Sequence, residues 1–312
     1  MEQLIKQTKI YEILKSAKQS GSLSHAYLIN LDDEKILKDF LKELSLVFFD
    51  ENFTLKERIE NETFSDILFF PKDGAKFLVE DAERIVEESA IMPVEGDIKL
   101  FVITDLSKAT PQSQNKLLKV IEEPPKGVYF LFGASNLFSI LPTVLSRVKT
   151  LDVPPFSAEQ VTEYFQRNVF FKENQKPFVR PCAALCMGKI GSTEKLVLSG
   201  DYQPLISCCQ SLLLCEKDEL PVLVKKVGEP SFKGLIFSTL SIIFKDALLI
   251  KKGIENTSLK EEEFWIKKVA NKFSFNTLLF AFECILNAEK ELFFHSSFSM
   301  TLETCLLKIF NH

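Results

Sequence analysis

The chain has 312 residues, of which 46% are hydrophobic and 26% are charged, a composition typical of an ordinary soluble folded protein. This length exceeds that of most single domains, so two or three domains are expected. A formal net charge of −5 argues against a protein that binds nucleic acid by itself, because such proteins usually carry a basic surface. The partners of this chain are therefore expected to be proteins.

The sequence contains no pattern of a signal peptide or a membrane span and no paired-cysteine motif. The first six residues lack the apolar core of a signal peptide, and no apolar stretch approaches the roughly 20 residues of a membrane span. We therefore expect a cytoplasmic chain without a membrane contact. The seven cysteines include no C-x-x-C pair, and the chain has only three histidines. This pattern indicates reduced thiols and predicts no metal site.

The first part of the chain alternates helical and strand patterns. Apolar residues recur at helical spacing over 3–18, and a short apolar run over 24–30 predicts the first strand. A strongly apolar helix is expected over 33–48, with Asp32 and Asp33 as its N-terminal cap and first turn. The patterns that follow predict, in order, a strand over 66–71, a turn over 72–75 and an acidic helix over 79–92.

The next stretch has the pattern strand, helix, strand, and it ends in an arginine. A buried strand is predicted over 100–103, because the run is short, branched and aromatic and stops at polar residues. Pro111 suits the first turn of a helix over 110–123, and a double proline ends that helix. With another strand predicted over 128–136, these lengths form a βαβ unit, which predicts a parallel α/β sheet.

Two motifs stand in this stretch: Asn-Lys-Leu-Leu-Lys-Val-Ile-Glu-Glu-Pro-Pro at 115–125 and Leu-Pro-Thr-Val-Leu-Ser-Arg at 141–147. The ordered pair resembles the bacterial clamp-loader branch of the AAA+ ATPases. In that family the Glu-Glu-Pro-Pro corner follows the helix after the Walker B strand, and the Ser-Arg pair supplies an arginine finger to the neighbouring subunit's ATP. The resemblance implies that Arg147, with Ser146 beside it, acts in trans. The residues alone also allow a surface arginine, or one paired with a carboxylate of its own chain.

Two parts that an ATPase of this family needs are missing. A phosphate-binding loop requires Gly-x-x-x-x-Gly-Lys-Ser/Thr, whereas the first strand is followed by Leu-Asp-Asp-Glu-Lys-Ile-Leu. Its consecutive carboxylates, Asp32, Asp33 and Glu34, would repel a triphosphate. By the resemblance, Thr104 takes the metal position and Asp105 the water-positioning one, and a neutral hydroxyl binds Mg²⁺ poorly. The chain is expected to bind no nucleotide or other cofactor and to have no ATPase activity of its own.

After a strand predicted over 150–153, the pattern is helical to the end of the chain. A capping-box-like start follows at Ser157 to Gln160. Helices are predicted over 157–168, 176–187, 192–199, 204–215, 232–252, 261–272, 275–291 and 297–310.

The predicted fold class is a AAA+-like α/β domain over 1–155, with a RecA-like parallel sheet, flanking helices and a degenerate phosphate-binding loop. By the resemblance, an all-α lid of three helices follows over 156–202, and an all-α C-terminal collar for oligomerisation occupies 203–312.

The resemblance implies a function in DNA replication, as a non-catalytic stator subunit of the hetero-oligomeric clamp loader in the DNA polymerase III holoenzyme. The implied partners are the gamma/tau and delta subunits and, through the assembly, the sliding clamp and primed DNA. Other functions stay open at this point. They are a degenerate AAA+ scaffold of another assembly, an active ATP-driven loader subunit with an unrecognised nucleotide site, and an interaction protein in which Arg147 is idle.

Overall fold

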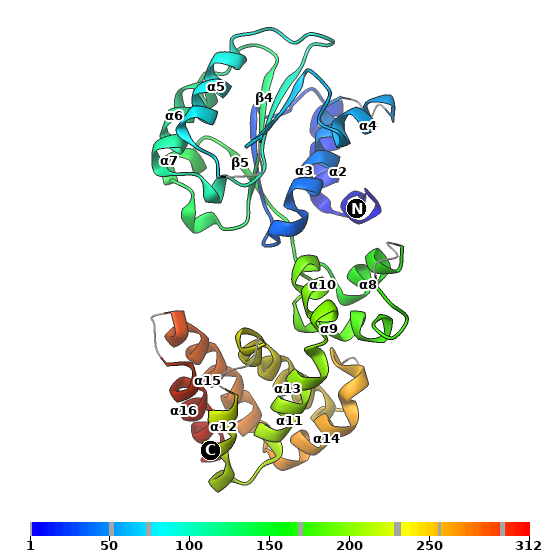
Figure 1. Ribbon diagram of the computed structural model, residues 1–312, viewed down its shortest axis with the longest axis vertical. Coiled ribbons are helices and arrows are strands. Elements are labelled where there is room, and N and C mark those ends of the chain that lie inside the picture. The colour runs from blue at the N-terminus through cyan, green and yellow to red at the C-terminus, as the bar shows by residue number, and fades with distance from the viewer. Residues whose placement is uncertain are drawn as a thin grey trace. The chain divides into compact units, whose positions relative to one another are not determined.

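Five parallel strands form one sheet in the order β2-β3-β4-β1-β5 (Figure 1). All five lie where the sequence predicts strands, and the parallel α/β sheet is confirmed. Because strands covered on both faces bury nearly every side chain, their sequences are apolar runs, and every residue of β3 is buried. The strands are β1 (Ala26–Asn30), β2 (Ile67–Phe70), β3 (Lys99–Ile103), β4 (Val128–Ala134) and β5 (Lys149–Asp152).

The computed structural model describes residues 2–49, 53–72, 76–167, 171–227, 232–254, 257–293 and 297–312. Most of the turn predicted over 72–75 lies outside these residues, and so does the end of the helix predicted to reach Asn168. The chain is divided by its internal contacts into two units, Met1–Pro155 and Phe156–His312.

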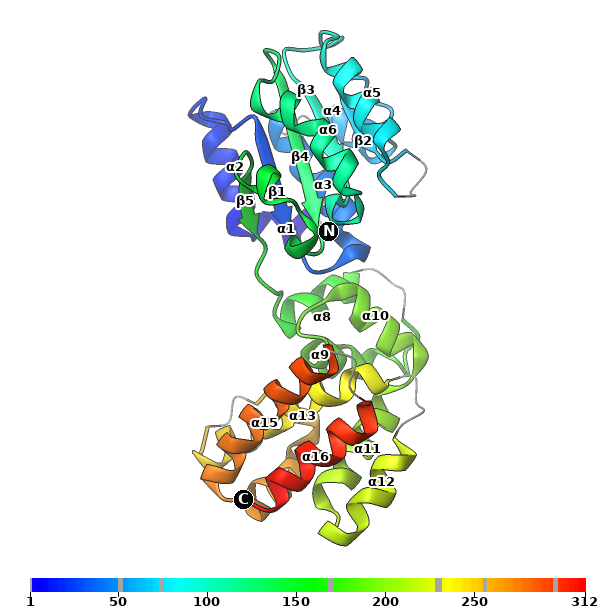
Figure 2. The same ribbon diagram turned by 90° about the vertical axis from the view of Figure 1, so that its left-hand side faces the viewer.

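Helices cover both faces of the sheet in the first unit. The connection from β1 to β2 crosses the sheet in one direction, and the connections through β3 to β4 return in the other. Right-handed crossovers of opposite direction place their helices on opposite faces. One face carries α5 (Val79–Ser89), α6 (Pro111–Glu122) and α7 (Pro142–Leu145), and Figure 2 looks onto α5 and α6. The other carries α3 (Glu34–Phe48), with which α1 (Glu2–Lys6), α2 (Lys9–Gln19) and α4 (Phe53–Glu60) pack.

The core under α5 and α6 is aromatic. The ring of Phe130 on β4 stacks on Phe101 of β3 and on Phe132, with ring centroids 5.5 and 5.9 Å apart. α6 contributes Leu117 and Ile121, which are fully buried in this cluster, and Leu118, which is partly buried against it. Thr110 caps the helix by accepting a hydrogen bond from the Ser113 amide. Pro111 can begin the helix because the N–H that it lacks would have no partner within the helix.

Several helix ends differ from the prediction by a few residues, and the helical pattern over 3–18 is split into α1 and α2, which begins after its N-cap residue Thr8. α5 ends at Ser89 and not at Met92, although the apolar residues continue. A residue outside the helix holds the loop that follows α5. The Asp66 carboxylate accepts hydrogen bonds from the amides of Val94 and Glu95 at 2.6 and 2.8 Å. α3 begins at Glu34, one residue after Asp33, whose side chain stands at the N-cap without a capping hydrogen bond.

The second unit is helical, as predicted. Ser157 and Gln160 exchange the two hydrogen bonds of a capping box, which confirms the predicted start of α8. α13 packs against α9, α11, α14 and α15. The described helices of this unit are α8 (Ala158–Arg167), α9 (Val179–Leu185), α10 (Ile190–Ser199), α11 (Tyr202–Leu214), α12 (Leu220–Lys226), α13 (Ile236–Lys251), α14 (Glu263–Lys272), α15 (Phe275–Phe293) and α16 (Phe298–Phe310), with short 3-10 turns between them. The separation into a lid over 156–202 and a collar over 203–312 stays a prediction.

All seven cysteines are free thiols, as the sequence predicts. Burial raises the pKa of the Cys208 thiol to about 11, so this sulfur stays protonated at neutral pH. Within the described ranges, no cluster of histidine, cysteine or acidic side chains has the arrangement of a metal site. None of the helices described is long and apolar enough to cross a bilayer.

Candidate functional site

The carboxyl ends of parallel strands are where α/β proteins bind ligands, so the connection after β1 is the first place to examine. It consists of three residues, Leu31 to Asp33, between the end of β1 and the start of α3. The Leu31 amide donates to the Ala134 carbonyl at 2.9 Å, and the Asp33 amide donates to the Leu31 carbonyl at 2.7 Å. None of the three has a positive φ. This backbone therefore lacks the length and the left-handed turns that let a loop wrap around phosphates.

Charged side chains at this edge are paired with one another. Glu34 in the first turn of α3 accepts a hydrogen bond from Lys108 Nζ at 2.6 Å. Lys108 belongs to a 3-10 turn, η1 (Leu106–Lys108), and lies 3.8 Å from Asp105. The hydrogen bond to Glu34 is the largest cause that raises the pKa of Lys108. The lysine is therefore held as a cation by carboxylates of its own chain.

Asp105, the residue predicted at the water-positioning place, is the centre of a hydrogen-bond network. Its carboxylate accepts from the amide and hydroxyl of Ser135 at 3.2 and 2.8 Å, and from the amide and hydroxyl of Ser107, the amide at 3.1 Å. Thr104, at the predicted metal position, donates its hydroxyl to the Phe70 carbonyl at 3.2 Å. We call Thr104, Asp105, Ser107 and Ser135, with Leu31–Asp33, Glu34 and Lys108, the carboxyl edge. Its hydrogen bonds join the ends of β1, β2, β3 and β4.

Gly133 explains how closely α3 lies on this edge. A Cβ atom at this position would lie 2.3 Å from the Thr104 carbonyl oxygen and 2.9 and 3.0 Å from methyl groups of Leu41 and Leu37. No larger residue fits without a shift of the backbone. The sequence analysis missed this glycine, because a glycine inside an apolar run signals close packing without saying what approaches.

The two family motifs meet at the other end of α6. Arg147 donates from Nε to the Glu122 carboxylate at 3.1 Å, and from Nη1 to the Thr143 carbonyl at 3.0 Å and the Ser146 hydroxyl at 3.2 Å. Its side chain is 33% exposed, and that of Glu122 is 56% exposed. We call Glu122, Thr143, Ser146 and Arg147 the arginine corner. These bonds use Nε and Nη1, and Nη2 has no hydrogen-bond partner in the described part of the chain.

A buried glutamine, which the sequence analysis missed, holds the segment that leads to Arg147. Gln114 on α6 is 1% exposed. Its amide nitrogen donates to the carbonyl of Ser139 at 2.9 Å, and its amide oxygen accepts from the Leu141 amide at 2.9 Å. Ser139 ends the 3-10 turn η2 (Leu137–Ser139), and Leu141 is the N-cap residue of α7. The signal was present, because Gln114 lies on the same helical stripe as Leu117 and Ile121.

The fold and these sites define the class. A parallel sheet in this order, with helices on both faces, an edge after β1 in the place of a nucleotide site and a helical second unit, is a AAA+-like architecture.

Comparison with known proteins shows what the chain is similar to. Residues 6–157 match the family model described as "DNA polymerase III, delta subunit". The chain is 24% identical over 285 residues to the DNA polymerase III subunit gamma of Buchnera aphidicola, covering 81% of this chain and 76% of that one. It is 21% identical over 303 residues to the DNA polymerase III subunit delta' of Bacillus subtilis, covering 92% and 91%. The chain is thus similar, over its first half by the family model and more widely by these relatives, to the clamp-loader subunits of DNA polymerase III.

Solved structures give matches across the whole chain. A DNA polymerase III gamma subunit-related protein from Thermotoga maritima has a TM-score of 0.41 and 18% identity, over 96% of this chain and 98% of that one. The Bacillus subtilis DNA clamp loader delta protein has a TM-score of 0.37 and 13% identity, over 97% and 100%. At such scores the fold assignment depends on the sheet order and connections described above.

Proposed function

We propose that this chain is a delta-prime-type stator of the DNA polymerase III clamp loader, without ATPase activity of its own. Arg147, with Ser146 beside it, reaches the ATP held by a neighbouring gamma/tau subunit. The assembly, which also contains the delta subunit, then loads the sliding clamp onto primed DNA. The lid over 156–202 connects the AAA+-like domain to a collar over 203–312 that holds the ring together.

One observation carries this proposal. The chain has only three residues between β1 and α3, and its edge cations and carboxylates are already paired, as Glu34 is with Lys108 at 2.6 Å. A triphosphate placed there would meet Asp32, Asp33 and Glu34 without a backbone cradle. On this proposal the chain has no site for a nucleotide of its own, but it retains Arg147, which acts on the nucleotide bound by another subunit.

The arginine corner suits exchange of partners. An ion pair between exposed side chains contributes about 0–1 kcal/mol, so Glu122 is a weak competitor for Arg147. A γ-phosphate carries more charge and accepts the forked donors of a guanidinium at two oxygens. An arginine delivered in trans is typically worth about 10³–10⁵ in the rate of phosphoryl transfer. Glu122 therefore holds the guanidinium ready at the surface until a phosphate replaces the carboxylate.

The similarity to a subunit named gamma favours one rival, a loader subunit that binds and hydrolyses ATP itself. Titration of the isolated chain with a fluorescent ATP analogue and Mg²⁺ separates the two. The stator proposal expects no saturable binding up to millimolar nucleotide. Micromolar binding of the analogue, reversed by competition with unlabelled ATP, would refute the stator proposal.

The arginine is tested in the reconstituted assembly, with hydrolysis measured at the one ATP site that faces this chain while the other sites are inactivated. We expect Arg147→Ala to lower that rate by about 10³ or more, and Arg147→Lys to recover little of it. Arg58→Ala is the matched control, because Arg58 also forms an exposed pair, with Glu95 at 2.6 Å. If Arg147→Ala and Arg58→Ala hydrolyse ATP equally fast, Arg147 is not a finger.

A further inference from the structure

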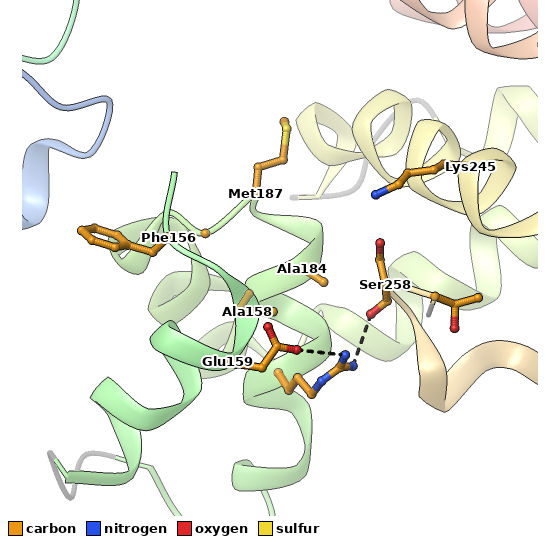
Figure 3. A pocket seen from close by; sticks show the side chains of 11 residues that line it. Phe156, Ala158, Glu159, Ala184, Met187, Lys245 and Ser258 are labelled. Atoms are coloured by element: carbon orange, nitrogen blue, oxygen red, sulfur yellow. Dashed lines mark hydrogen bonds and ion pairs between the residues drawn. The ribbon is translucent and has the colours of Figure 1, made fainter. Parts of the chain in front are cut away.

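A pocket of about 260 Å³ lies within the second unit and shares no residue with the sites described above. Its walls come from the start of α8, from α9 and the turn after it, from Lys245 on α13, and from Thr257 and Ser258 (Figure 3). Neither the family match, which ends at residue 157, nor the proposed function gives this pocket a role.

Two cations line it. Lys245 points its ammonium group into the pocket in Figure 3, and none of the described residues forms an ion pair or a hydrogen bond with it. Arg180 on α9 donates to the Ser258 carbonyl at 3.3 Å and contacts the carboxylates of Glu159 and Glu261 at 3.4 Å. Contacts of this length are weak hydrogen bonds, so the guanidinium can turn to a better acceptor.

A buried hydroxyl lies in the same wall. Thr257 is 2% exposed, and its Oγ1 has no hydrogen-bond partner among the described residues. Folded proteins leave few such groups, because a buried donor without an acceptor is destabilising. Thr257 contributes to the lining, but its Oγ1 has no surface open to a group bound in the pocket.

The rim of the pocket is strained. Met187, which follows α9, has φ of +50°, a region that residues other than glycine rarely adopt. The next residue, Gly188, has φ of +77°, and a Cβ there would lie 1.9 Å from the Phe156 carbonyl oxygen. Met187 is the strained residue of the pair, whereas Gly188 takes its φ without strain and its amide caps α9 by donating to the Ala183 carbonyl at 2.9 Å. A strained residue other than glycine occurs often at binding sites.

We propose that this pocket binds an oxyanion, the phosphate or carboxylate group of a small molecule, between the Lys245 ammonium and the Arg180 guanidinium. Glu159 and Glu261 both contact Arg180, whereas Lys245 has no carboxylate partner among the described residues, so the lysine is the cation most open to an anion. The volume lies below the roughly 300–1,000 Å³ of drug-sized ligand sites, which favours a small ligand over a nucleoside triphosphate. The bound anion would link α9 to α13.

The test measures the thermal unfolding of the full chain in sodium phosphate, sodium acetate and sodium chloride at equal ionic strength. A ligand that binds only the folded chain raises the unfolding midpoint, by on the order of a few degrees when it is far above its Kd. The salt that raises the unfolding midpoint above its value in chloride identifies the bound group as phosphate or carboxylate. Because phosphate also stabilises proteins by exclusion from their surface, variants decide whether the effect arises in the pocket.

We expect Lys245→Ala to lose the anion-specific shift and Lys226→Ala, which removes an exposed lysine from α12, to keep it. Glu159→Gln removes one competing carboxylate and should tighten anion binding several-fold. Thr257→Val should raise the midpoint in chloride, because it removes an unsatisfied hydroxyl, and should leave the response to the anion unchanged. The proposal is overturned if neither anion raises the midpoint above its value in chloride, or if Lys245→Ala and Lys226→Ala respond alike.

Discussion

The carboxyl edge and the arginine corner lie in one unit and use similar side chains, yet they differ in how firmly each charge is held. At the edge, Asp105 is 11% exposed and accepts four hydrogen bonds. At the corner, Arg147 meets a carboxylate that is 56% exposed, and part of its guanidinium stays without a partner in the described chain. A charged cluster therefore indicates a binding site only where its partners can be exchanged, and the corner meets that condition better than the edge.

The largest effect is expected at the packing behind the carboxyl edge. Gly133→Ala would place a Cβ 2.3 Å from the Thr104 carbonyl oxygen, and the free energy of unfolding should fall by about 3 kcal/mol. Urea unfolding of the full chain, followed by circular dichroism, measures it. Gly96→Ala is the control, because no atom lies within 4 Å of a Cβ there, and it should change stability by less than about 0.5 kcal/mol. Equal stability of the two variants would show that α3 can move away from the edge.

The second effect concerns the segment that carries Arg147. Gln114→Ala leaves the Ser139 carbonyl and the Leu141 amide without a partner, which should cost about 2 kcal/mol. It should also slow ATP hydrolysis by the reconstituted assembly, because α7 loses its link to α6. Gln112→Ala, on the exposed side of the same helix, should change neither measurement. If Gln114→Ala lost stability but kept full assembly activity, Gln114 would not be needed to position Arg147.

The third prediction contrasts Asp105 with Arg147. Asp105→Asn keeps the size of the side chain but replaces an acceptor by a donor facing the Ser107 and Ser135 hydrogen bonds, so the free energy of unfolding should fall by about 1–3 kcal/mol. The same change should leave nucleotide binding by the isolated chain undetectable. Arg147→Ala should do the reverse, with stability nearly unchanged and assembly ATPase strongly reduced. An Asp105→Asn chain as stable as the original would mean that the network contributes nothing to the fold.

Much of the fold could be predicted, because the strands are short apolar runs between polar residues and most helices have a clear apolar stripe. Two helices that the sequence pattern did not predict, Phe53–Glu60 and Leu220–Lys226, are short and have an incomplete apolar face. The end of α5 was misplaced because it depends on Asp66, which lies far from it in the sequence and binds the loop beyond it. Local pattern cannot reveal such a contact.

The candidate site was less accessible to prediction. Arg147 was identified from its motif, but its partner Glu122 lies 25 positions earlier, and Lys108 meets Glu34 across 74 positions. The missing phosphate loop was visible because it depends on adjacent residues. Pairing across the sheet depends on which strand ends lie together, and the strand order was not predicted from the sequence.

The smallest effect is expected for the Glu34–Lys108 pair. The hydrogen bond to Glu34 raises the pKa of Lys108 above its ordinary value of 10.5. A lysine with a raised pKa stabilises the fold below its unfolded pKa, and this contribution is lost as the pH rises through the folded pKa. Because the two side chains are 46% and 61% exposed, Glu34→Gln should cost only a few tenths of a kcal/mol at pH 8.

The measurement compares unfolding free energies of the original chain and Glu34→Gln between pH 8 and pH 12, at low and at about 1 M salt. The difference should shrink above pH 10.5 and should also vanish in high salt, where exposed charges are screened. A difference that grows with pH would contradict the assigned pairing. If the pair proves as weak as expected, the proposed function predicts that Glu34→Gln will still not bind ATP, because the three-residue connection and the contact at Gly133 are unchanged. Binding of ATP by this variant would mean that the ion pair, and not backbone length and packing, blocks a nucleotide site.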